Sequence, residues 1–217
     1  MKRDELRLFD PTADWDVVLR GVPHWSQPGV VTFVTWRLAD SLPASALRRI
    51  DREIDALLTR EGLDPRLSHR EQLEQLPPAR RSAVQFKLFS IRDRFLDQGF
   101  GACYLESHEL AAVVMDSLHH FDGERYLLTD AVVMPNHVHF LCAFASETEM
   151  LKQCTDLKRF IARDINRQLG RKGELWQVDQ FDHLVRSPEQ FDCLQRYVAE
   201  NPVKADLEPG TFLLYPS

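Results

Sequence analysis

No stretch of this sequence is apolar for long enough to cross a membrane, which takes about 18 uncharged residues in a row. The N-terminus has basic residues but no apolar segment behind them, so no signal peptide is expected and the protein is predicted to be cytoplasmic. Cysteine is scarce: the chain has four, and no two of them form a C-x-x-C pair. We therefore expect reduced thiols in the core rather than disulfides.

An excess of positive charge is also missing, because 27 Lys and Arg residues stand against 33 Asp and Glu residues, a net charge of −6. Proteins that bind nucleic acids are usually basic overall, so this balance speaks mildly against such a partner, although a local patch can carry the binding. Apolar residues are plentiful at 44% and include thirteen Phe. A folded protein is therefore expected, and 217 residues suffice for one domain with a sizeable insertion.

The hydrophobic pattern predicts an α+β fold. Apolar and β-branched runs predict strands over residues 30–36, 126–134, 137–144 and 182–186. Helical spacing of apolar residues predicts helices over residues 107–121, 147–170 and 188–201. Residues 44–98 are charge-rich and helical, and we interpret them as an insertion. Without them the order is β-α-β-β-α-β, a ferredoxin-like antiparallel sheet with an appended C-terminal helix, all within one domain of residues 1–217.

Local signals place several element ends. Pro135 and Asn136 separate two predicted strands by two residues, which indicates a hairpin, and its strands should form the middle of the sheet. Gly170 suits the position just after the long helix. Residues 1–28 contain several prolines and are expected to be an irregular arm.

The last helix has a clear start and a predicted stop. Ser187 is a suitable N-cap, and Gln190 can close a capping box with it. The helix should end near Asn201, because Pro202 disfavours helical geometry in the residue before it.

Two histidines carry the strongest local signal. His137 and His139 stand two apart on a predicted strand, so they project from the same face, roughly 6.5 to 7 Å apart along the backbone. That separation lets two imidazoles converge on one metal ion. Val138 and Phe140 should face the other way, toward the helices. A buried pair of structural histidines is the alternative.

A second pair lies on the last helix. Tyr197 and Asn201 are four residues apart and therefore share a helix face. Asn201 could offer its amide oxygen to a metal, with the Tyr197 hydroxyl near the same ion. A phenol, with a pKa near ~10, is a poor nucleophile at neutral pH, but a metal-polarised phosphate could make its attack feasible. The alternative is a half-buried aromatic side chain and a helix C-cap.

The long helix carries a basic stripe. Arg159, Arg163 and Arg167 recur at four-residue spacing opposite the apolar face, with Lys158 and Arg171 close by. A stripe of this kind matches phosphates spaced along a nucleic-acid strand. A solvated surface helix is the alternative.

Residues 133–141, VMPNHVHFL, resemble the HUH motif of the small single-strand transposases, specifically the REP-associated tyrosine transposases. The segments LKRF (157–160), LWQ (175–177), FDHLVR (181–186) and YVAENPVKA (197–205) match the order and spacing of that family. The similarity spans about residues 20–40 and 100–207, whereas residues 44–98 are extra relative to a minimal member. H-x-H alone is weak, but its combination with Tyr-x-x-x-Asn-Pro about 60 residues later is specific.

The resemblance implies a function for each matching residue. It implies that His137, His139 and Asn201 bind Mg²⁺ or Mn²⁺ and that Tyr197 attacks a backbone phosphate of single-stranded DNA. The product would be a 5′-phosphotyrosine and a free 3′-hydroxyl, as in an endonuclease and strand transferase of hairpin-associated sites. Some relatives carry glutamine where this chain has Asn201. A set of two imidazoles and one amide is neutral, which suggests weak metal binding with positions open for phosphate oxygens.

The resemblance also implies that basic residues hold single-stranded or hairpin DNA. The residues expected to do so are Lys158, Arg159, Arg163, Arg167, Arg171 and Arg186. Trp176 is expected to be packed in the interior more readily than to stack on a base, and His183 is expected to make a hydrogen bond in the core.

Two other functions stay open at this point. A non-catalytic binder of single-stranded or hairpin DNA would keep the fold, although it would be free to lose any of the four site residues. A metal-dependent phosphodiesterase would use water in place of Tyr197. The sequence gives neither the DNA recognised nor whether the protein still moves DNA. It also leaves undecided whether the site forms within a monomer or a homodimer, and what residues 44–98 do.

Overall fold

The computed structural model describes residues 6–10, 16–20, 22–178 and 180–216. The chain divides into two compact units. One consists of residues 1–39 with residues 102–217 and contains the sheet, and the other consists of residues 40–101 and is helical.

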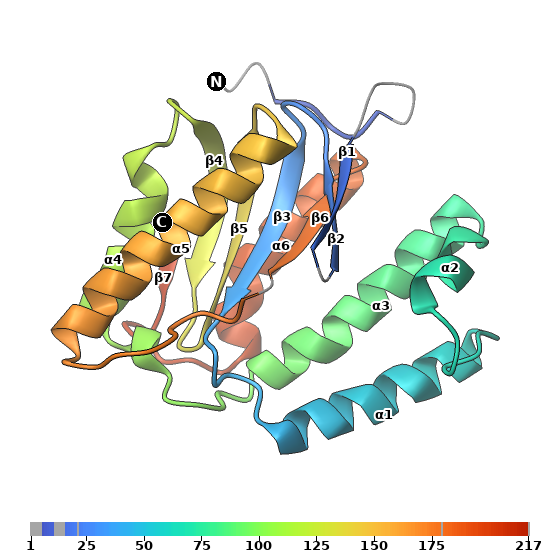
Figure 1. Ribbon diagram of the computed structural model, residues 1–217, viewed down its shortest axis with the longest axis horizontal. Helices are drawn as coiled ribbons and strands as arrows, with labels where there is room; N and C mark the ends of the chain where they lie inside the picture. The colour runs from blue at the N-terminus through green and yellow to red at the C-terminus, as the bar shows by residue number, and fades with distance from the viewer. Residues whose placement is uncertain (1–5, 11–15, 21, 179, 217) are drawn as a thin grey trace. The chain divides into compact units, whose positions relative to one another are not determined.

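A five-stranded antiparallel sheet forms the centre of the first unit in the described residues, in the order β6-β3-β5-β4-β7 (Figure 1). Its strands are β3 (Val31–Arg37), β4 (Tyr126–Val133), β5 (His137–Phe144), β6 (Phe181–Leu184) and β7 (Leu213–Tyr215). The tight turn between β4 and β5 is closed by Met134, whose backbone N–H donates to the carbonyl of His137 at 2.9 Å. The predicted hairpin is therefore present, and both of its strands lie in the interior of the sheet.

Helices cover the sheet on both sides. α4 (His108–His120) follows the short 3₁₀ turn η2 (Tyr104–Glu106) and packs with α5 (Glu147–Gln168) on one face. On that face Val138, Phe140 and Cys142 of β5 join a core with the apolar side chains of both helices, as expected from the strand alternation. α6 (Pro188–Lys204) runs along the opposite face and contacts β4 and β5 (Figure 1).

The N-terminal segment differs from its prediction as an irregular arm. β1 (Asp16–Arg20) and β2 (Val22–Ser26) pair antiparallel as a separate two-stranded sheet. Pro23 concealed this strand in the sequence, but in a two-stranded sheet both strands are edges, where a residue without an N–H is tolerated. The three-residue strand β7 near the C-terminus was also missed, because it is too short to show a period.

The end of α6 is a second correction. The helix continues through Pro202 to Lys204 instead of ending near Asn201. Proline removes only one backbone donor, and its fixed φ is close to the helical value, so the last turn accommodates it. The carbonyl of Asn201 still accepts a hydrogen bond from the N–H of Ala205 at 3.1 Å. The extension places Lys204 two turns after Tyr197 on the same side of the helix.

The start of α6 agrees with its prediction except in one bond. The Ser187 side chain caps the helix by accepting from the N–H of Gln190 at 3.2 Å. The Gln190 amide oxygen accepts from the N–H of Arg186 at 2.8 Å, one residue earlier than a reciprocal capping box requires.

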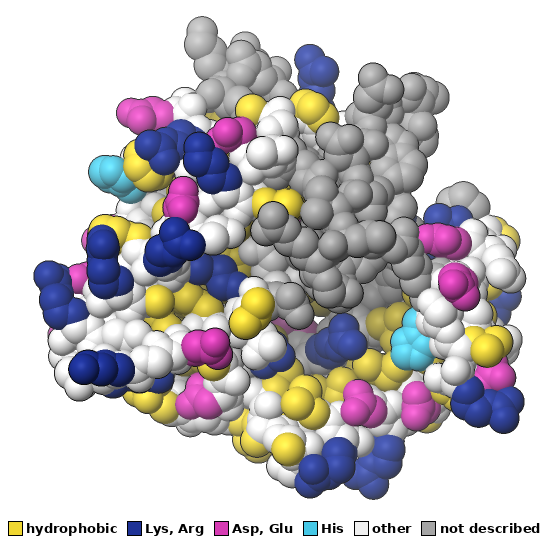
Figure 2. Space-filling model, viewed as in Figure 1, with side chains coloured by type: hydrophobic (Ala, Val, Ile, Leu, Met, Phe, Trp, Pro, Cys, Tyr) yellow, Lys and Arg dark blue, Asp and Glu magenta, His cyan; other side chains and the backbone are white. Residues whose placement is uncertain are grey.

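α5 ends as predicted, with Gly170 just after the helix at a positive φ of 61°. Phe160 and Leu169 recur at helical spacing with Leu157, Ile161 and Ile165, which would place them on the core face, but both are exposed. Figure 2 shows Lys and Arg side chains over this helix interspersed with acidic ones. Asp156 pairs with Arg159, and Asp164 pairs with Arg167. The stripe is therefore partly neutralised by its own helix.

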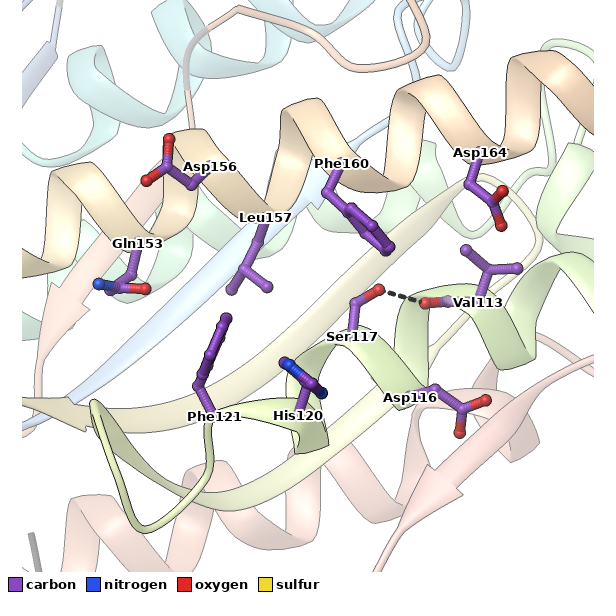
Figure 3. Close-up of a pocket in the computed structure, with 10 residues that line it drawn as sticks. All are labelled: Val113, Asp116, Ser117, His120, Phe121, Gln153, Asp156, Leu157, Phe160 and Asp164. Carbon is purple, nitrogen blue, oxygen red and sulfur yellow. Dashed lines mark hydrogen bonds between the residues drawn. The ribbon is translucent and has the colours of Figure 1, made fainter.

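A hollow of about 520 Å³ lies between α4 and α5 (Figure 3). Phe121, Leu157 and Phe160 form its apolar lining, and Asp116 and Asp164 also line it. This hollow lies on the α4 and α5 side of the sheet, away from α6.

The helical unit of residues 40–101 has a small core of its own. It contains α1 (Ala44–Arg60), α2 (His69–Glu74) and α3 (Pro78–Leu96). Ile50, Ile54 and Phe95 are among its buried core residues. α3 starts at Pro78, and proline is well suited to the first helical turn.

Within the described part of the chain, no helix is both long and apolar enough to cross a membrane. The four cysteines are free thiols, as expected, but only Cys142 and Cys154 lie in the core, whereas Cys103 is half-buried and Cys193 is exposed. Burial raises the pKa of the Cys154 thiol to about 12 and that of Cys142 also well above its usual value, so both are inert side chains of the core.

Candidate active site

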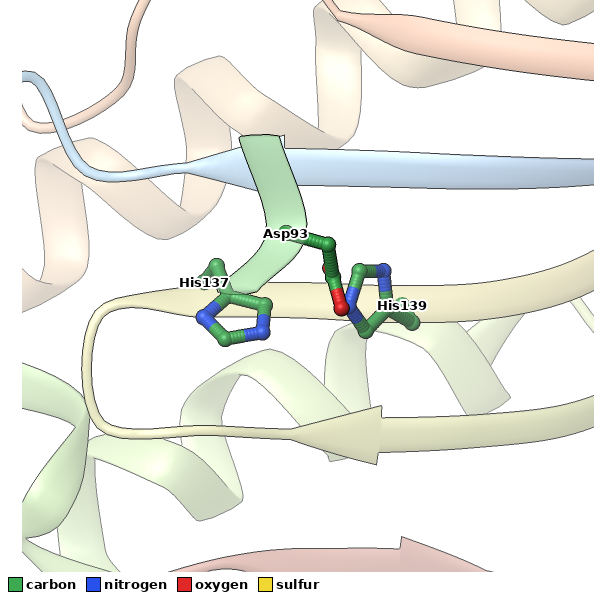
Figure 4. Close-up of side chains that lie close together, drawn as sticks. All are labelled: Asp93, His137 and His139. Atoms are coloured by element: carbon green, nitrogen blue, oxygen red, sulfur yellow. The ribbon is translucent and has the colours of Figure 1, made fainter. Parts of the chain in front are cut away.

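His137 and His139 lie on β5 and turn toward the same face, the one covered by α6 (Figure 4). Their ring centroids are 4.7 Å apart, and both side chains are buried, at 1% and 0% exposure. Asp93, also drawn in Figure 4, belongs to the helical unit. Two buried imidazoles this close could bind one metal ion.

Asn136 sets the tautomer of His137. The amide oxygen of Asn136 lies 2.7 Å from His137 Nδ1, and because an amide oxygen only accepts, Nδ1 must carry the proton and donate. When this ring is neutral, its lone pair is therefore on Nε2. A hydrogen bond at one ring nitrogen that prepares the other for a metal is a common feature of metal-binding histidines.

His139 is held by the neighbouring strand. Thr35 and His139 are direct partners in the β3–β5 register, and Thr35 Oγ1 lies 2.8 Å from His139 Nδ1 in a buried hydrogen bond. The ring of Phe33 stacks on His139 with a centroid distance of 5.3 Å. Both contacts fix the orientation of the His139 ring.

Tyr197 reaches the histidines from α6. Its ring meets the His139 ring edge-on, with centroids 5.6 Å apart, and meets Phe33 at 6.0 Å. Tyr197 is half-buried, whereas the histidines are buried. Side chains that are 58 residues apart in the sequence thus form one cluster, in which the Tyr197 ring remains partly open to solvent.

Asn201 lies one turn after Tyr197 on α6 and is completely buried. Neither its amide oxygen nor its amide nitrogen has a hydrogen-bond partner among the residues described. A buried amide without partners is destabilising by about 1–3 kcal/mol, and such groups in native proteins usually serve another purpose. Coordination of a metal ion by the Asn201 amide oxygen would be such a purpose.

His137, His139 and Asn201 form a chemically suitable set for a divalent ion. The tautomer of His137 presents a lone pair at Nε2, and the amide of Asn201 is buried without partners. All three donors are neutral, which favours weak binding and leaves the charge of an ion to act on phosphate oxygens.

Two further contacts hold α6 to the sheet around the site. Gln195 Nε2 donates to both carboxylate oxygens of Asp130 on β4, at 3.2 and 2.9 Å. Gln190 Nε2 donates to His183 Nε2 on β6 at 2.8 Å, so His183 makes the hydrogen bond expected of it. Burial, together with nearby Arg186, lowers the pKa of His183 to about 4, which keeps this imidazole neutral.

The basic residues of α5 lie in a different layer from the histidines, because α5 packs on the opposite face of the sheet. Lys158 Nζ donates to the carbonyls of Gln177 and Val178, at 2.7 and 3.1 Å. The Arg163 guanidinium lies 5.5 Å from the centroid of the exposed Phe160 ring. Arg171 lies over Tyr104 at 4.8 Å in the same way.

Arg186 and Trp176 were also considered as DNA-binding residues from the sequence. Arg186 lies outside α5, between β6 and α6, with its guanidinium carbon 5.8 Å from the centroid of the Phe9 ring. Trp176 is 6% exposed and packs edge-on against Trp36 with centroids 5.9 Å apart. Trp176 is therefore a core residue and not a stacking platform for a base.

Sequence reasoning missed the residues that position the site. Phe33 and Thr35 were assigned only to a strand, and Asn136 only to a turn. Strand alternation places Phe33 and Thr35 on one face of β3. Their position beside His139 depends on the register between β3 and β5, which are about 100 residues apart in the sequence and whose pairing the sequence did not reveal. Lys204 was missed because the helix was expected to end before it. Its ammonium lies 4.4 Å from the centroid of the Tyr197 ring.

Comparison with known proteins gives a limited result. No family model and no curated protein matches the chain. One similar solved structure is that of a REP-associated tyrosine transposase bound to a REP hairpin. The identity is 16%, the match covers 86% of this chain and 74% of the other, and the TM-score is 0.42.

Proposed function

We propose that the protein is a metal-dependent single-stranded DNA endonuclease and strand transferase with Tyr197 as its nucleophile. The observation that carries this proposal is the cluster of Tyr197, His139 and His137 on one face of the sheet. A non-catalytic DNA binder has no need for a tyrosine beside two histidines with oriented rings. The sheet order β6-β3-β5-β4 supports the ferredoxin-like arrangement expected for such an enzyme.

In the proposed reaction the Tyr197 hydroxyl oxygen forms a bond to a backbone phosphorus, and the bond from phosphorus to the 3′ oxygen breaks. The phenolic proton leaves Tyr197, and the departing 3′ oxygen takes up a proton to become a hydroxyl group. The phosphate ester is conserved as a 5′-phosphotyrosine, so a second 3′-hydroxyl can reverse the step and join strands. The Tyr197 ring is half-buried and its hydroxyl oxygen is buried, so the hydroxyl must become accessible before DNA can reach it.

The histidines and Asn201 would hold the metal ion, Mg²⁺ or Mn²⁺. When bound there, such an ion polarises the scissile phosphate and orients its oxygens. Thr35 and Asn136 keep the two imidazole rings in place and so maintain the donor geometry that the ion needs.

The basic residues of α5 are proposed to bind DNA outside the cleavage site, because α5 lies in the layer on the other side of the sheet. The residues proposed to contact DNA are Lys158, Arg159, Arg163 and Arg167 on α5, Arg171 just beyond its end, and Arg186 between β6 and α6. Replacing Arg159, Arg163 and Arg167 by glutamine should weaken DNA binding. The slope of log affinity against log salt should become shallower by about 0.7 for each phosphate contact that is lost. The rate of the covalent step at saturating DNA should remain unchanged, which separates binding from chemistry.

A covalent-adduct experiment tests the proposal. The purified protein is incubated with Mn²⁺ or Mg²⁺ and a hairpin-containing DNA strand labelled at its 3′ end, and the products are separated on a denaturing gel. A 5′-phosphotyrosine keeps the 3′ label on the protein, so a labelled band at the size of the protein plus DNA is expected. A 5′ label should instead appear in a short free fragment.

Matched variants make the experiment specific. Tyr197→Phe should abolish the adduct, whereas Tyr215→Phe should not, because Tyr215 packs against His119 away from the cluster. His137→Ala should abolish it, whereas His120→Ala on α4 should not. DNA binding without an adduct across a library of hairpins would favour the non-catalytic binder. Cleavage that persists in Tyr197→Phe would favour hydrolysis by water.

A further inference from the structure

We infer that Lys204, lying over the ring of Tyr197, holds a phosphate of the DNA strand beside that tyrosine, a role that rests on the proposed function of Tyr197. The ammonium of Lys204 lies 4.4 Å from the centroid of the Tyr197 ring. The side chain reaches this position because α6 continues beyond Pro202, which places Lys204 seven residues after Tyr197 on the same side of the helix.

The charge of Lys204 is available to a ligand. Lys204 is exposed, and it forms no ion pair with any carboxylate in the described ranges. The basic residues of α5 contrast with it, since Arg159 and Arg167 pair with aspartates of their own helix. A cation above an aromatic ring keeps its N–H donors, so Lys204 can contact the ring and still donate to phosphate oxygens.

The location of Lys204 fits a phosphate close to the nucleophile. In a reactive arrangement the phosphorus lies about 3–3.5 Å from the attacking oxygen. The rings of His139 and Phe33 enclose Tyr197 on one side, and the Tyr197 hydroxyl oxygen is buried. The strand must therefore approach from the side of the ring that remains exposed, and the hydroxyl must become accessible there. Lys204 comes from that helix face. An ammonium there would neutralise a phosphate oxygen and also hold the Tyr197 ring in place.

Lys204 is thus assigned as a positioning residue with a contact to the DNA backbone. If Lys204 has this role, the affinity for DNA and its salt dependence should change when the charge of Lys204 is removed. The geometry of attack by Tyr197 should change when the ammonium is displaced. A purely structural cation–π contact would affect neither the salt dependence of DNA binding nor the concentration of DNA that gives half the maximal adduct rate.

The test compares three variants in the complete protein. Lys204→Gln removes the charge, and Lys204→Arg keeps it. Arg196→Gln removes one charge from the same helix at an exposed site that faces away from Tyr197 by about 100°, where the Arg196 Nε donates to the carbonyl of Asp192. Fluorescence anisotropy of a labelled single-stranded hairpin oligonucleotide is measured over a range of salt concentrations, and the adduct rate is measured over a range of DNA concentrations.

For Lys204→Gln we expect the slope of log affinity against log salt to become shallower by about 0.7, the value for one contact to a single-stranded phosphate. The half-saturating DNA concentration should rise severalfold, and the adduct rate at saturation should fall about tenfold. Lys204→Arg should restore most of both, and Arg196→Gln should leave the salt slope as in the wild type. All variants should unfold at the same urea concentration within error.

Two results would overturn the inference: an unchanged salt slope in Lys204→Gln, or an equal change in Arg196→Gln. The failure of the proposed function is distinguishable from either. If the wild-type protein binds DNA without forming an adduct and Lys204→Gln still reduces the salt slope, the phosphate contact stands and the tyrosine chemistry does not. If the wild-type protein does not bind DNA at all, both fail.

Discussion

The hydrogen bond between Thr35 and His139 offers the sharpest test of how the sheet prepares the site. Thr35→Val keeps the size and β-branched shape of the side chain and removes only the hydroxyl that lies 2.8 Å from His139 Nδ1. Valine is well accepted in strands, so β3 should keep its pairing with β5 and β6. The substitution therefore removes only the hydrogen bond that orients the His139 imidazole.

The expected magnitude follows from the burial of this bond. Thr35 is 6% exposed and His139 is 0% exposed, so water does not replace the lost partner. Loss of such an outer contact typically weakens metal binding by about 10- to 100-fold, which corresponds to about 1.4–2.7 kcal/mol. Leaving a buried ring nitrogen without its bond should also lower the free energy of unfolding by about 1–3 kcal/mol.

Two assays measure these effects separately. The Mn²⁺ concentration that gives half the maximal adduct rate reports on metal binding, and urea unfolding without metal reports on stability. Thr32→Val is the matched control, because Thr32 is buried on the same strand but faces the other side, with a long bond of 3.4 Å to the carbonyl of Val30. The reasoning would be refuted if Thr35→Val and Thr32→Val required the same Mn²⁺ concentration within twofold.

Three further predictions test individual residues. Asn201→Leu should abolish the adduct but leave the metal-free free energy of unfolding unchanged or raise it by about 1 kcal/mol, because a buried amide without partners is replaced by an apolar group; a large loss of stability in urea would contradict this. His183 has a folded-state pKa of about 4, below its ordinary 6.5, so its contribution to stability is complete above pH 6.5 and is lost as the pH falls toward 4. Between pH 7 and pH 5 the wild type should therefore lose about 2 kcal/mol more than His183→Gln in urea titrations. Gly170→Ala should cost about 1 kcal/mol in the same assay, since φ is +61° and an added Cβ meets no atom within 4 Å, and a neutral result would show that the helix end can adjust.

The parts of the structure that follow from local chemistry were predictable. The alternation of strand side chains placed His137 and His139 on one face and Phe140 on the other, and Gly170 marked a helix end by its need for a positive φ. These rules involve neighbours in the sequence, and at these positions the tertiary structure agrees with them.

The failures arose where tertiary structure or a neighbouring strand overrides a local rule. Pro202 was interpreted as the end of α6, but a single missing N–H in the last turn is tolerated by a helix that packs on a sheet. Pro23 was interpreted as a breaker, although it lies in a two-stranded sheet. The neighbour of His139 on β3 could not be derived, because a shift of register by two residues keeps the same face and exchanges Thr35 for another side chain.

The charge of the protein and the chemistry of the site are compatible for a physical reason. An acidic chain repels DNA at long range, so affinity must come from a few local cations. At the site the candidate ligands His137, His139 and Asn201 are neutral, and an amide oxygen and a hydroxyl orient the two imidazoles. A divalent ion held by these groups would keep nearly its full charge for the scissile phosphate, and Lys204 would add one more positive charge on the face from which DNA arrives. Replacing Asn201 by Asp should therefore tighten metal binding while slowing attack on the phosphate, because a negative ligand would strengthen the hold on the ion and repel the substrate at the same point.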